Sequence, residues 1–293
     1  MGKTIFTPVV DMNMPWKQKL RRSIDVRKTL LCVGLDTDLG RFPSDLIRDL
    51  GGQVGINREI VSATSDLAAA YKPNLAFYEK EGPEGIRALH DTVRMIREEA
   101  PGSIVILDAK RGDIGNTSKA YASAAFDSMK ADSITVNAYM GKDAVIPFSA
   151  DPEKLVFVLC RTSNQAASEI QDLEMDGEPL YLRMARIIKG WNDNDNLGLV
   201  VGATFPEELK RIREAVGFDM PILVPGVGAQ GGDLRPVLEY GTDISGSGVL
   251  INVSRGIMFA FQNDGGSLGE SARQAASGYY QMIRSEMEKL GRW

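Results

Sequence analysis

The chain alternates short apolar runs with longer segments in which apolar residues recur every three or four positions. Eight of the short runs, most of them rich in Val, Ile and Leu, are bounded by Gly, Pro or polar residues. They cover residues 30–35, 71–75, 103–107, 133–137, 155–160, 197–201, 221–225 and 249–252. Apolar runs of about four to eight residues predict strands that are buried on both faces, as in a parallel sheet.

The periodic segments between these runs predict helices. They cover residues 57–69, 83–100, 119–130, 180–191 and 206–215, and a C-terminal helix directs Ala272, Ala276, Tyr279, Ile283 and Leu290 toward the core. A further helix is expected over residues 15–28, because Trp16, Leu20 and Ile24 form one apolar stripe. Strands that alternate with helices, without a break in composition, predict one domain over residues 1–293, a (β/α)8 TIM barrel with an extra N-terminal helix.

Charged side chains lie at the ends of the first three predicted strands. Asp36 follows the first run, Lys72 lies in the second, and Asp108 and Lys110 follow the third. Side chains two positions apart in a strand point the same way, so we expect Asp108 and Lys110 to share a face, as Lys72 does with Asn74. A solvated ion pair is the ordinary explanation of an isolated Asp-x-Lys. In a (β/α)8 barrel, however, catalytic groups lie at the carboxyl ends of the strands, and we therefore predict an active site there.

Two loops at the same end of the expected barrel are suited to bind an anion. The seventh strand is followed by a glycine-rich segment over residues 226–233, whose backbone N–H groups can surround a phosphate. The eighth strand is followed by Val253-Ser254-Arg255, at the expected start of a helix. Phosphate sites of such barrels commonly lie in these two loops, which predicts a phosphorylated substrate.

Composition limits the partners and the compartment. A net charge of -5 disfavours nucleic acid or an anionic membrane as the main partner. Cys32 and Cys160 lie within apolar runs, as buried reduced thiols do. No apolar run approaches the length of a signal peptide core or a membrane span, and we expect a soluble, cytoplasmic protein.

The residue types present also limit the chemistry. His90 is the single histidine and lies within a predicted helix, which disfavours a histidine relay or a multi-histidine metal site. A lysine flanked by carboxylates keeps its proton, so it is suited to act as an acid and an electrostatic anchor. Asp36 and Asp108 leave a magnesium site open in principle.

Six motifs, in order along nearly the whole chain, resemble those of orotidine 5′-phosphate decarboxylases of the longer bacterial type, the type 2 subfamily. They are Cys-Val-Gly-Leu-Asp ending at Asp36, Lys72-Pro73-Asn74 with Phe77-Tyr78-Glu79, Asp108-x-Lys110-Arg111-Gly112-Asp113-Ile114-Gly115, Thr162-Ser163-Asn164, Pro225 to Asp233, and Ser254-Arg255-Gly256-Ile257. One departure follows Asn164, where Gln165-Ala166-Ala167 replaces the usual Pro-Gly. The polar connection over residues 165–179 is long enough to be a lid, and we expect the departure to affect the lid rather than the chemistry.

The resemblance implies decarboxylation of orotidine 5′-monophosphate to uridine 5′-monophosphate, the last step of de novo pyrimidine nucleotide synthesis, with no cofactor and no metal. It implies a catalytic network of Lys72, Asp108, Lys110 and Asp113, in a homodimer whose Asp113 reaches into the partner's site. The implied substrate contacts are Asp36 and the partner-derived Thr117 on the ribose, Ser163 on the pyrimidine, Ile114 beside the reacting carboxylate, Gln230 and Arg255 on the phosphate, and the further positions Asn74, Pro225, Gly228 and Ser254.

The chemistry of this reaction fits the residue types. Loss of CO2 from C6 of the pyrimidine leaves a carbanion without an adjacent carbonyl, so the site must supply preorganised positive charge. Lys110 would stabilise that charge and then protonate C6. Two alternatives remain open, a Mg²⁺-dependent sugar-phosphate lyase on the same barrel and a non-catalytic phosphopyrimidine-binding protein.

Overall fold

The computed structural model describes residues 14–227 and 232–293, and within them the apolar runs form a closed barrel of parallel strands. Its strands are β1 (Leu31–Leu35), β2 (Ala70–Pro73), β3 (Ile104–Arg111), β4 (Ser133–Val136), β5 (Leu155–Arg161), β8 (Leu197–Val201), β9 (Ile222–Pro225) and β10 (Val249–Val253). They are neighbours in chain order, and β10 closes the barrel by pairing with β1. The predicted (β/α)8 fold is confirmed.

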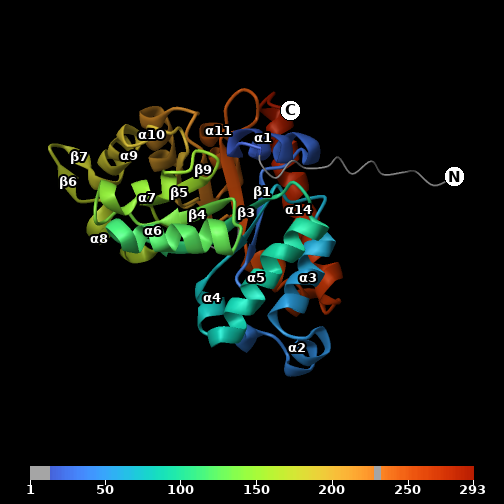
Figure 1. Cartoon of the computed structure of the whole chain (residues 1–293). Coiled ribbons are helices and arrows are strands. Elements are labelled where there is room, and N and C mark those ends of the chain that lie inside the picture. The colour runs from blue at the N-terminus through green and yellow to red at the C-terminus, as the bar shows by residue number, and fades with distance from the viewer. Residues whose placement is uncertain (1–13, 228–231) are drawn as a thin grey trace.

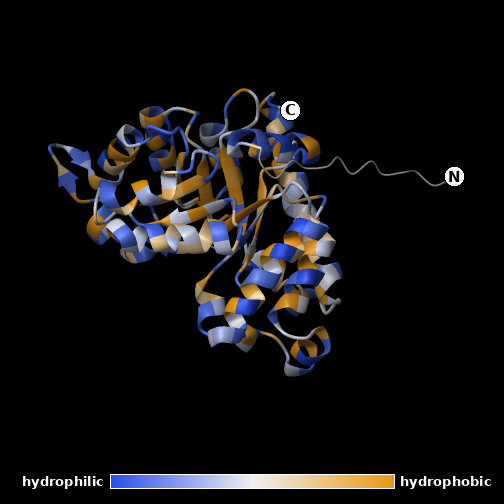
Figure 2. Ribbon diagram, viewed as in Figure 1, coloured by the Kyte–Doolittle hydropathy of each residue, from blue (hydrophilic) through white to orange (hydrophobic). Residues whose placement is uncertain are grey.

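Helices connect the strands and cover the barrel. The longer ones are α1 (Trp16–Arg27), α2 (Ser44–Leu50), α3 (Gln53–Thr64), α5 (Gly82–Glu99), α6 (Gly115–Ser123), α9 (Leu180–Gly190), α10 (Pro206–Val216), α11 (Leu234–Gly241) and α14 (Leu268–Lys289). Figure 1 shows α3, α5 and α14 on one side of the strands and α6, α9 and α10 on the other. Figure 2 shows the strands as mostly hydrophobic and the helices as mixed, in keeping with helices that bury one face.

The core contains the side chains that the pattern predicted. Every residue of β1 is buried, and so are Trp16, Leu20 and Ile24 of α1. Cys32 and Cys160 are buried free thiols, as expected. No helix among the described residues is long and apolar enough to cross a membrane.

Helix α1 closes the amino-terminal end of the barrel. Ser23 donates a hydrogen bond to the Ala69 carbonyl (2.7 Å), and Arg27 donates to the Pro101 carbonyl (2.9 Å), just before β2 and β3 begin. Lys19 forms an ion pair with Asp132, just before β4. The predicted extra helix is therefore confirmed, and it leaves the carboxyl ends of the strands free to form a site.

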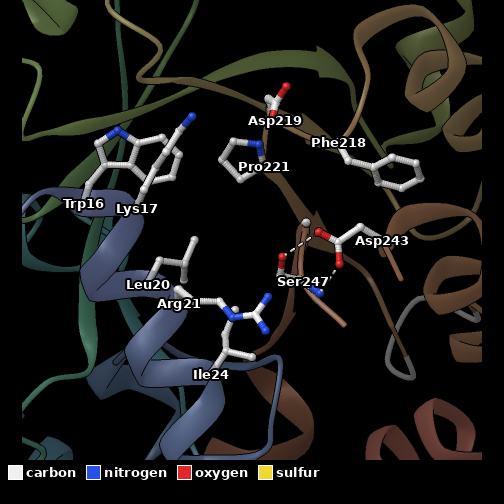
Figure 3. Close-up of a pocket in the computed structure, with 11 residues that line it drawn as sticks. Trp16, Lys17, Leu20, Arg21, Ile24, Phe218, Asp219, Pro221, Asp243 and Ser247 are labelled. Carbon is white, nitrogen blue, oxygen red and sulfur yellow. Dashed lines mark hydrogen bonds between the residues drawn. The ribbon is translucent and has the colours of Figure 1, made fainter. Parts of the chain in front are cut away.

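A cavity of about 170 Å³ lies beside α1, between its side chains and the loops before β9 and β10 (Figure 3). Several of its charged groups have partners outside or at the edge of the cavity. Arg21 binds Asp25 (2.7 Å), and Asp243 accepts a hydrogen bond from Ser247 Oγ (2.9 Å). This cavity is a packing gap at the closed end of the barrel, remote from the predicted site.

The predicted lid segment contains short elements of its own. Helix α8 (Ser168–Gln171) is followed by a hairpin of β6 (Glu174–Met175) and β7 (Glu178–Pro179), which projects from the barrel in Figure 1. Gln171 ties this segment to the end of β5, because its side chain accepts from Thr162 N (2.9 Å) and donates to Thr162 Oγ1 (2.7 Å).

Candidate active site

A buried carboxylate, Asp108, lies at the centre of a cluster of charges at the carboxyl ends of β1, β2 and β3. Its Oδ2 atom accepts from Lys72 Nζ (2.7 Å), and its Oδ1 atom accepts from Lys110 Nζ (2.6 Å) and from Thr135 Oγ1 (2.9 Å). Asp36 Oδ1 is 3.9 Å from Lys72 Nζ. The structure thus brings together the four charged residues that the strand ends predicted.

The pairing keeps the central charges ionised. Burial alone would lower the pKa of Lys72, which is 3% exposed, but the attraction of Asp108 and Asp36 outweighs it and raises that pKa above its ordinary value. Burial likewise opposes ionisation of Asp108, while Lys72 and Lys110 hold its pKa below the ordinary range. Lys72 and Asp108 therefore keep their opposite charges at neutral pH.

The ammonium of Lys72 also bears on the magnesium alternative. It lies between Asp36 and Asp108, the two carboxylates that were candidates for Mg²⁺ ligands. Within residues 14–227 and 232–293, no group of three or more His, Cys, Asp or Glu side chains is arranged to hold a metal ion. The described residues at this position fit a lysine cation rather than a metal.

The backbone of Lys110 departs from the simple strand alternation that we expected. Its φ is +47°, in the left-handed region that non-glycine residues seldom adopt, and the pairing of β3 with β4 shifts register between Leu107 and Arg111. Asp108 and Lys110 do pair, but through this irregularity and not through period-two alternation. Gly112 follows, and a Cβ there would lie 2.4 Å from the Asn137 carbonyl oxygen, so the close approach of the two segments requires glycine.

Two cavities adjoin the charged cluster and share Lys72, Asp108 and Pro225 as lining residues. The larger, about 440 Å³, also contains Lys110 and Ser163 and has apolar walls from Leu159, Val200 and Leu223. The smaller, about 150 Å³, is lined by Asp36, Gly226, Val227, Asn252, Val253, Ser254 and Arg255. An apolar-walled cavity beside a smaller one that ends in an arginine is suited to a flat ring joined to a phosphate.

Several predicted site residues lie away from these cavities. Asp113, Ile114 and Thr117 belong to the loop after β3 and the start of α6, and none of them lines either cavity of the described chain. The Asp113 carboxylate accepts from the Ile114 backbone N–H (2.7 Å). Asn74 directly follows β2 and forms an isolated parallel bridge with Asp108, and its side chain accepts from Ala76 N (3.3 Å). It lines neither cavity.

Gly228 and Gln230, which were predicted to bind the phosphate, lie outside the described residues. The flanking residues of the same loop, Gly226 and Val227, do line the smaller cavity.

Some residues of the site were not predicted. Thr135 on β4 lines the larger cavity and binds Asp108, and a polar residue near the end of an apolar run was the signal that could have revealed it. Gln171 lines the same cavity from the lid segment. Its position depends on a fold-back onto Thr162 that no local pattern indicates.

A (β/α)8 barrel with a Lys–Asp–Lys cluster beside a pocket that contains an arginine, at the carboxyl ends of its strands, is typical of enzymes that act on small phosphorylated substrates. The chain belongs to the orotidine 5′-phosphate decarboxylase / HUMPS family, which matches residues 29–264. The resemblance inferred from the six motifs is therefore confirmed.

Relatives and solved structures agree with this assignment. The chain is 48% identical to the orotidine 5′-phosphate decarboxylase of Herpetosiphon aurantiacus, over 89% of this chain and 95% of the relative. It is 46% identical to the enzyme of the same name from Thermomicrobium roseum, over 94% and 96%. The structure of Leishmania donovani OMP decarboxylase superimposes with a TM-score of 0.79 at 38% identity, over 93% of this chain and 98% of that one.

A longer protein contains the same fold. Leishmania donovani UMP synthase matches with a TM-score of 0.81 at 40% identity over 93% of this chain, which spans 56% of the UMP synthase chain.

Proposed function

We propose that this chain, acting as one catalytic domain, decarboxylates orotidine 5′-monophosphate to uridine 5′-monophosphate and is thus a carboxy-lyase of pyrimidine nucleotide synthesis. The observation that carries the proposal is the Lys72–Asp108–Lys110 cluster, which lies where the two cavities meet. The larger one, which contains Ser163, is here called the ring cavity, and the smaller one, which contains Arg255, the phosphate cavity. The family match and the names of the relatives support the same substrate.

Lys110 has the role of the acid. Departure of CO2 leaves the bonding electron pair on C6, and a fixed ammonium stabilises that charge without solvent reorganisation. The Lys110 side chain is half-exposed at the mouth of the ring cavity, and Asp108 holds its ammonium at 2.6 Å. Transfer of the Lys110 proton to C6 then completes the replacement of CO2 by hydrogen.

Asp108 and Lys72 keep the cluster in one charge state. Lys72 neutralises Asp108 from the buried side, so that the carboxylate remains ionised beside Lys110. The Asp108 carboxylate also faces the cavity in which the substrate carboxylate would lie, and its charge would favour the loss of that group as CO2.

Contacts remote from C6 supply binding energy that aligns the ring. Arg255 and Ser254 bind the phosphate with the loop after β9, to which Gly228 and Gln230 belong, and Asp36 binds the ribose. Ser163 contacts the pyrimidine from the ring cavity, which Pro225 borders. Asn74 is retained as a candidate substrate contact on the resemblance alone.

The proposal includes a homodimer in which Asp113 and Thr117 complete the partner's site. Support comes from their positions outside the cavities of their own chain and from apolar side chains exposed at the same end of the barrel. Ile114 is 52% exposed, Tyr139 90% and Met140 51%, and an interface would bury them. Ile114 would then line the partner's cavity. We place the reaction in the cytoplasm, as the free Cys32 and Cys160 suit a reducing compartment.

The test is the change in ultraviolet absorbance when orotidine 5′-monophosphate is added to the purified chain in EDTA. We expect rapid loss of substrate by the wild type and a fall of about 10³-fold or more in Lys110→Ala, which loses both the positive charge and the proton donor. Lys289→Ala, at the exposed end of α14, is the matched control and should retain wild-type turnover.

Each alternative gives a different result. Turnover of sugar phosphates that requires Mg²⁺ and is lost in EDTA would favour the lyase. Tight binding of uridine 5′-monophosphate without any turnover would favour a binding protein.

A further inference from the structure

The hydroxyl of Thr135, on β4, is hydrogen-bonded to both halves of the Asp108–Lys110 pair. Oγ1 donates to Asp108 Oδ1 (2.9 Å) and accepts from the backbone N–H groups of Ala109 (3.1 Å) and Lys110 (3.0 Å). One donor and two acceptor positions are the full capacity of a hydroxyl, and here all of them are used. Thr135 is 1% exposed, so its hydroxyl is shielded from water.

The two N–H groups need this hydroxyl because β3 and β4 are out of register there. Regular pairing ends at Leu107 with Ile134 and resumes only at Arg111 with Val136. Between these points the pairing of β3 with β4 gives Ala109 N and Lys110 N no backbone acceptor on β4. A backbone N–H that is partly shielded from water and has no acceptor is costly. The side chain of Thr135 takes the place of the missing carbonyl.

The same bonds stabilise the left-handed conformation of Lys110. A non-glycine residue with a φ of +47° persists only where its surroundings fix it. Here the backbone N–H of Lys110 is bound by Thr135, and its ammonium is bound by the Asp108 oxygen that Thr135 also contacts. A single hydroxyl therefore fixes both ends of Lys110.

We propose that Thr135 is a positioning residue, which sets the direction of the Asp108 carboxylate and of the Lys110 ammonium toward the reacting carbon. The inference rests on the proposed function, in which these two groups perform the chemistry. Because Arg255 and Ser163 bind the substrate from other elements, loss of the hydroxyl should affect kcat and leave ground-state binding nearly unchanged.

The experiment compares Thr135→Val, which keeps the branched shape but not the hydroxyl, with Thr135→Ser, which keeps the hydroxyl. For Thr135→Val we expect kcat to fall about 10- to 100-fold, the range for a lost hydrogen bond to an ionised group. KM for orotidine 5′-monophosphate and the Kd of uridine 5′-monophosphate should stay within about threefold. Thr135→Ser should recover kcat to within about threefold of the wild type.

Ser133 provides the matched control. It precedes Thr135 by two positions on β4, is fully buried, and its hydroxyl makes no hydrogen bond within the described part of the chain. Ser133→Ala should therefore leave kcat unchanged. An equal loss of kcat in Ser133→Ala, or a rise in KM at constant kcat in Thr135→Val, would overturn the positioning role.

Folding and function are separated by two further results. If Thr135→Val does not fold, Thr135→Ala removes the same hydroxyl without placing a methyl group against the two N–H groups, and carries the same expectation. Failure of both to fold would show that the hydroxyl serves the barrel and not the site, and would overturn the inference. No turnover by the wild type would overturn the proposed function itself, whereas an active wild type with an equally active Thr135→Val would overturn this inference alone.

Discussion

At the scale of single residues, glycines set how closely the strand ends approach around the ring cavity. Gly202 directly follows β8, and a Cβ placed there would lie 2.8 Å from Ser163 Cβ and 3.1 Å from Ser163 Cα. Because the backbone of Ser163 is part of this contact, a side-chain rotation cannot relieve it. The position of Ser163 in the cavity thus depends on the absence of a side chain at residue 202.

Gly202→Ala should therefore move Ser163 without altering any charged group. We expect kcat/KM for orotidine 5′-monophosphate to fall by about 10-fold or more, because a displacement of a fraction of an ångström misaligns the ring. Steady-state kinetics and circular dichroism would measure the activity and the integrity of the fold.

Gly190→Ala is the control for this substitution. Gly190 ends α9, and nothing lies within 4 Å of a Cβ there, so activity should match that of the wild type. Unchanged kinetics in folded Gly202→Ala would argue that Ser163 does not contact the pyrimidine.

Residue patterns predicted the members of the charged cluster but not how they are held. Lys72, Asp108 and Lys110 could be predicted because charges at the ends of buried strands are unusual. The left-handed Lys110 could not, since it results from a register shift against β4, a segment about 25 residues away in the chain. The role of Thr135 depends on the same shift and was hidden for the same reason.

At the scale of elements, strands were easier to predict than helices. A strand that is buried on both faces must consist almost entirely of apolar residues, which makes it easy to recognise in a sequence. The eight observed barrel strands overlap the eight apolar runs. Helix α3 begins and ends several residues earlier than expected, because Gly52 directly precedes it and Ala68 and Ala69 lead into β2. Helix α11 was missed, since Asp233 caps it directly after the glycine-rich loop and Pro236 interrupts the helical pattern.

Helix α1 is joined to the barrel by a network of ion pairs, whose contribution to the stability of the protein can be measured. Asp132, which is 8% exposed, pairs with Lys19 of α1 and with Arg97 of α5 (3.0 Å), and accepts from Val105 N (2.8 Å). Asp132→Asn removes the charge and leaves buried Lys19 without its carboxylate. We expect a loss of about 3 kcal/mol in the free energy of unfolding near pH 7, measured in urea.

The pH dependence of this loss follows from the direction of the pKa shift. Burial opposes ionisation of Asp132, but Lys19 and Arg97 outweigh it and hold its pKa below the ordinary value. A depressed folded-state pKa gives stability that is fully present above the unfolded pKa, near about 4, and is lost as the pH falls through the folded value. The difference between wild type and Asp132→Asn should be constant above about pH 5 and shrink below about pH 4.

An exposed ion pair of the same helix is the control. Lys17 binds Asp195, with side chains 42% and 57% exposed, so Asp195→Asn should cost less than about 1 kcal/mol. Asn also tolerates the left-handed backbone of residue 195. Since α1 lies at the closed end of the barrel, kcat should stay within about twofold in both variants. A loss in Asp132→Asn no larger than in Asp195→Asn would contradict the importance of burial.

At the scale of the whole molecule, a single chain supplies most residues of the proposed site, but its own Asp113 and Thr117 lie outside that site. Neither residue lines the two cavities of the described chain, although the motif that contains Asp113 also contains Asp108 and Lys110. The resemblance to the family implied this division between subunits, whereas no pattern within the sequence could, because an interface brings together residues of different chains.

Subunit exchange tests whether Asp113 acts across the interface. Lys110→Ala and Asp113→Ala homodimers should each be inactive. In a mixed dimer, the Asp113→Ala chain keeps Lys110 and receives Asp113 from its partner, so that one of the two sites is intact. Random exchange of equal amounts puts half of the chains in mixed dimers, and about a quarter of wild-type activity should return.

The control mixes Lys110→Ala with Lys72→Ala. Both lysines bind Asp108 of their own chain, so no mixed dimer of this pair contains an intact site and no activity should return. Equal recovery of activity in both mixtures would mean that activity returns by some other route. Mass spectrometry of differently tagged chains verifies that the subunits have exchanged. If they have exchanged and neither mixture recovers activity, Asp113 acts in the site of its own chain. Recovery confined to the Lys110→Ala and Asp113→Ala mixture requires a site built by two copies, because only in that mixture does one site combine intact Lys72, Asp108 and Lys110 of one chain with Asp113 of the other.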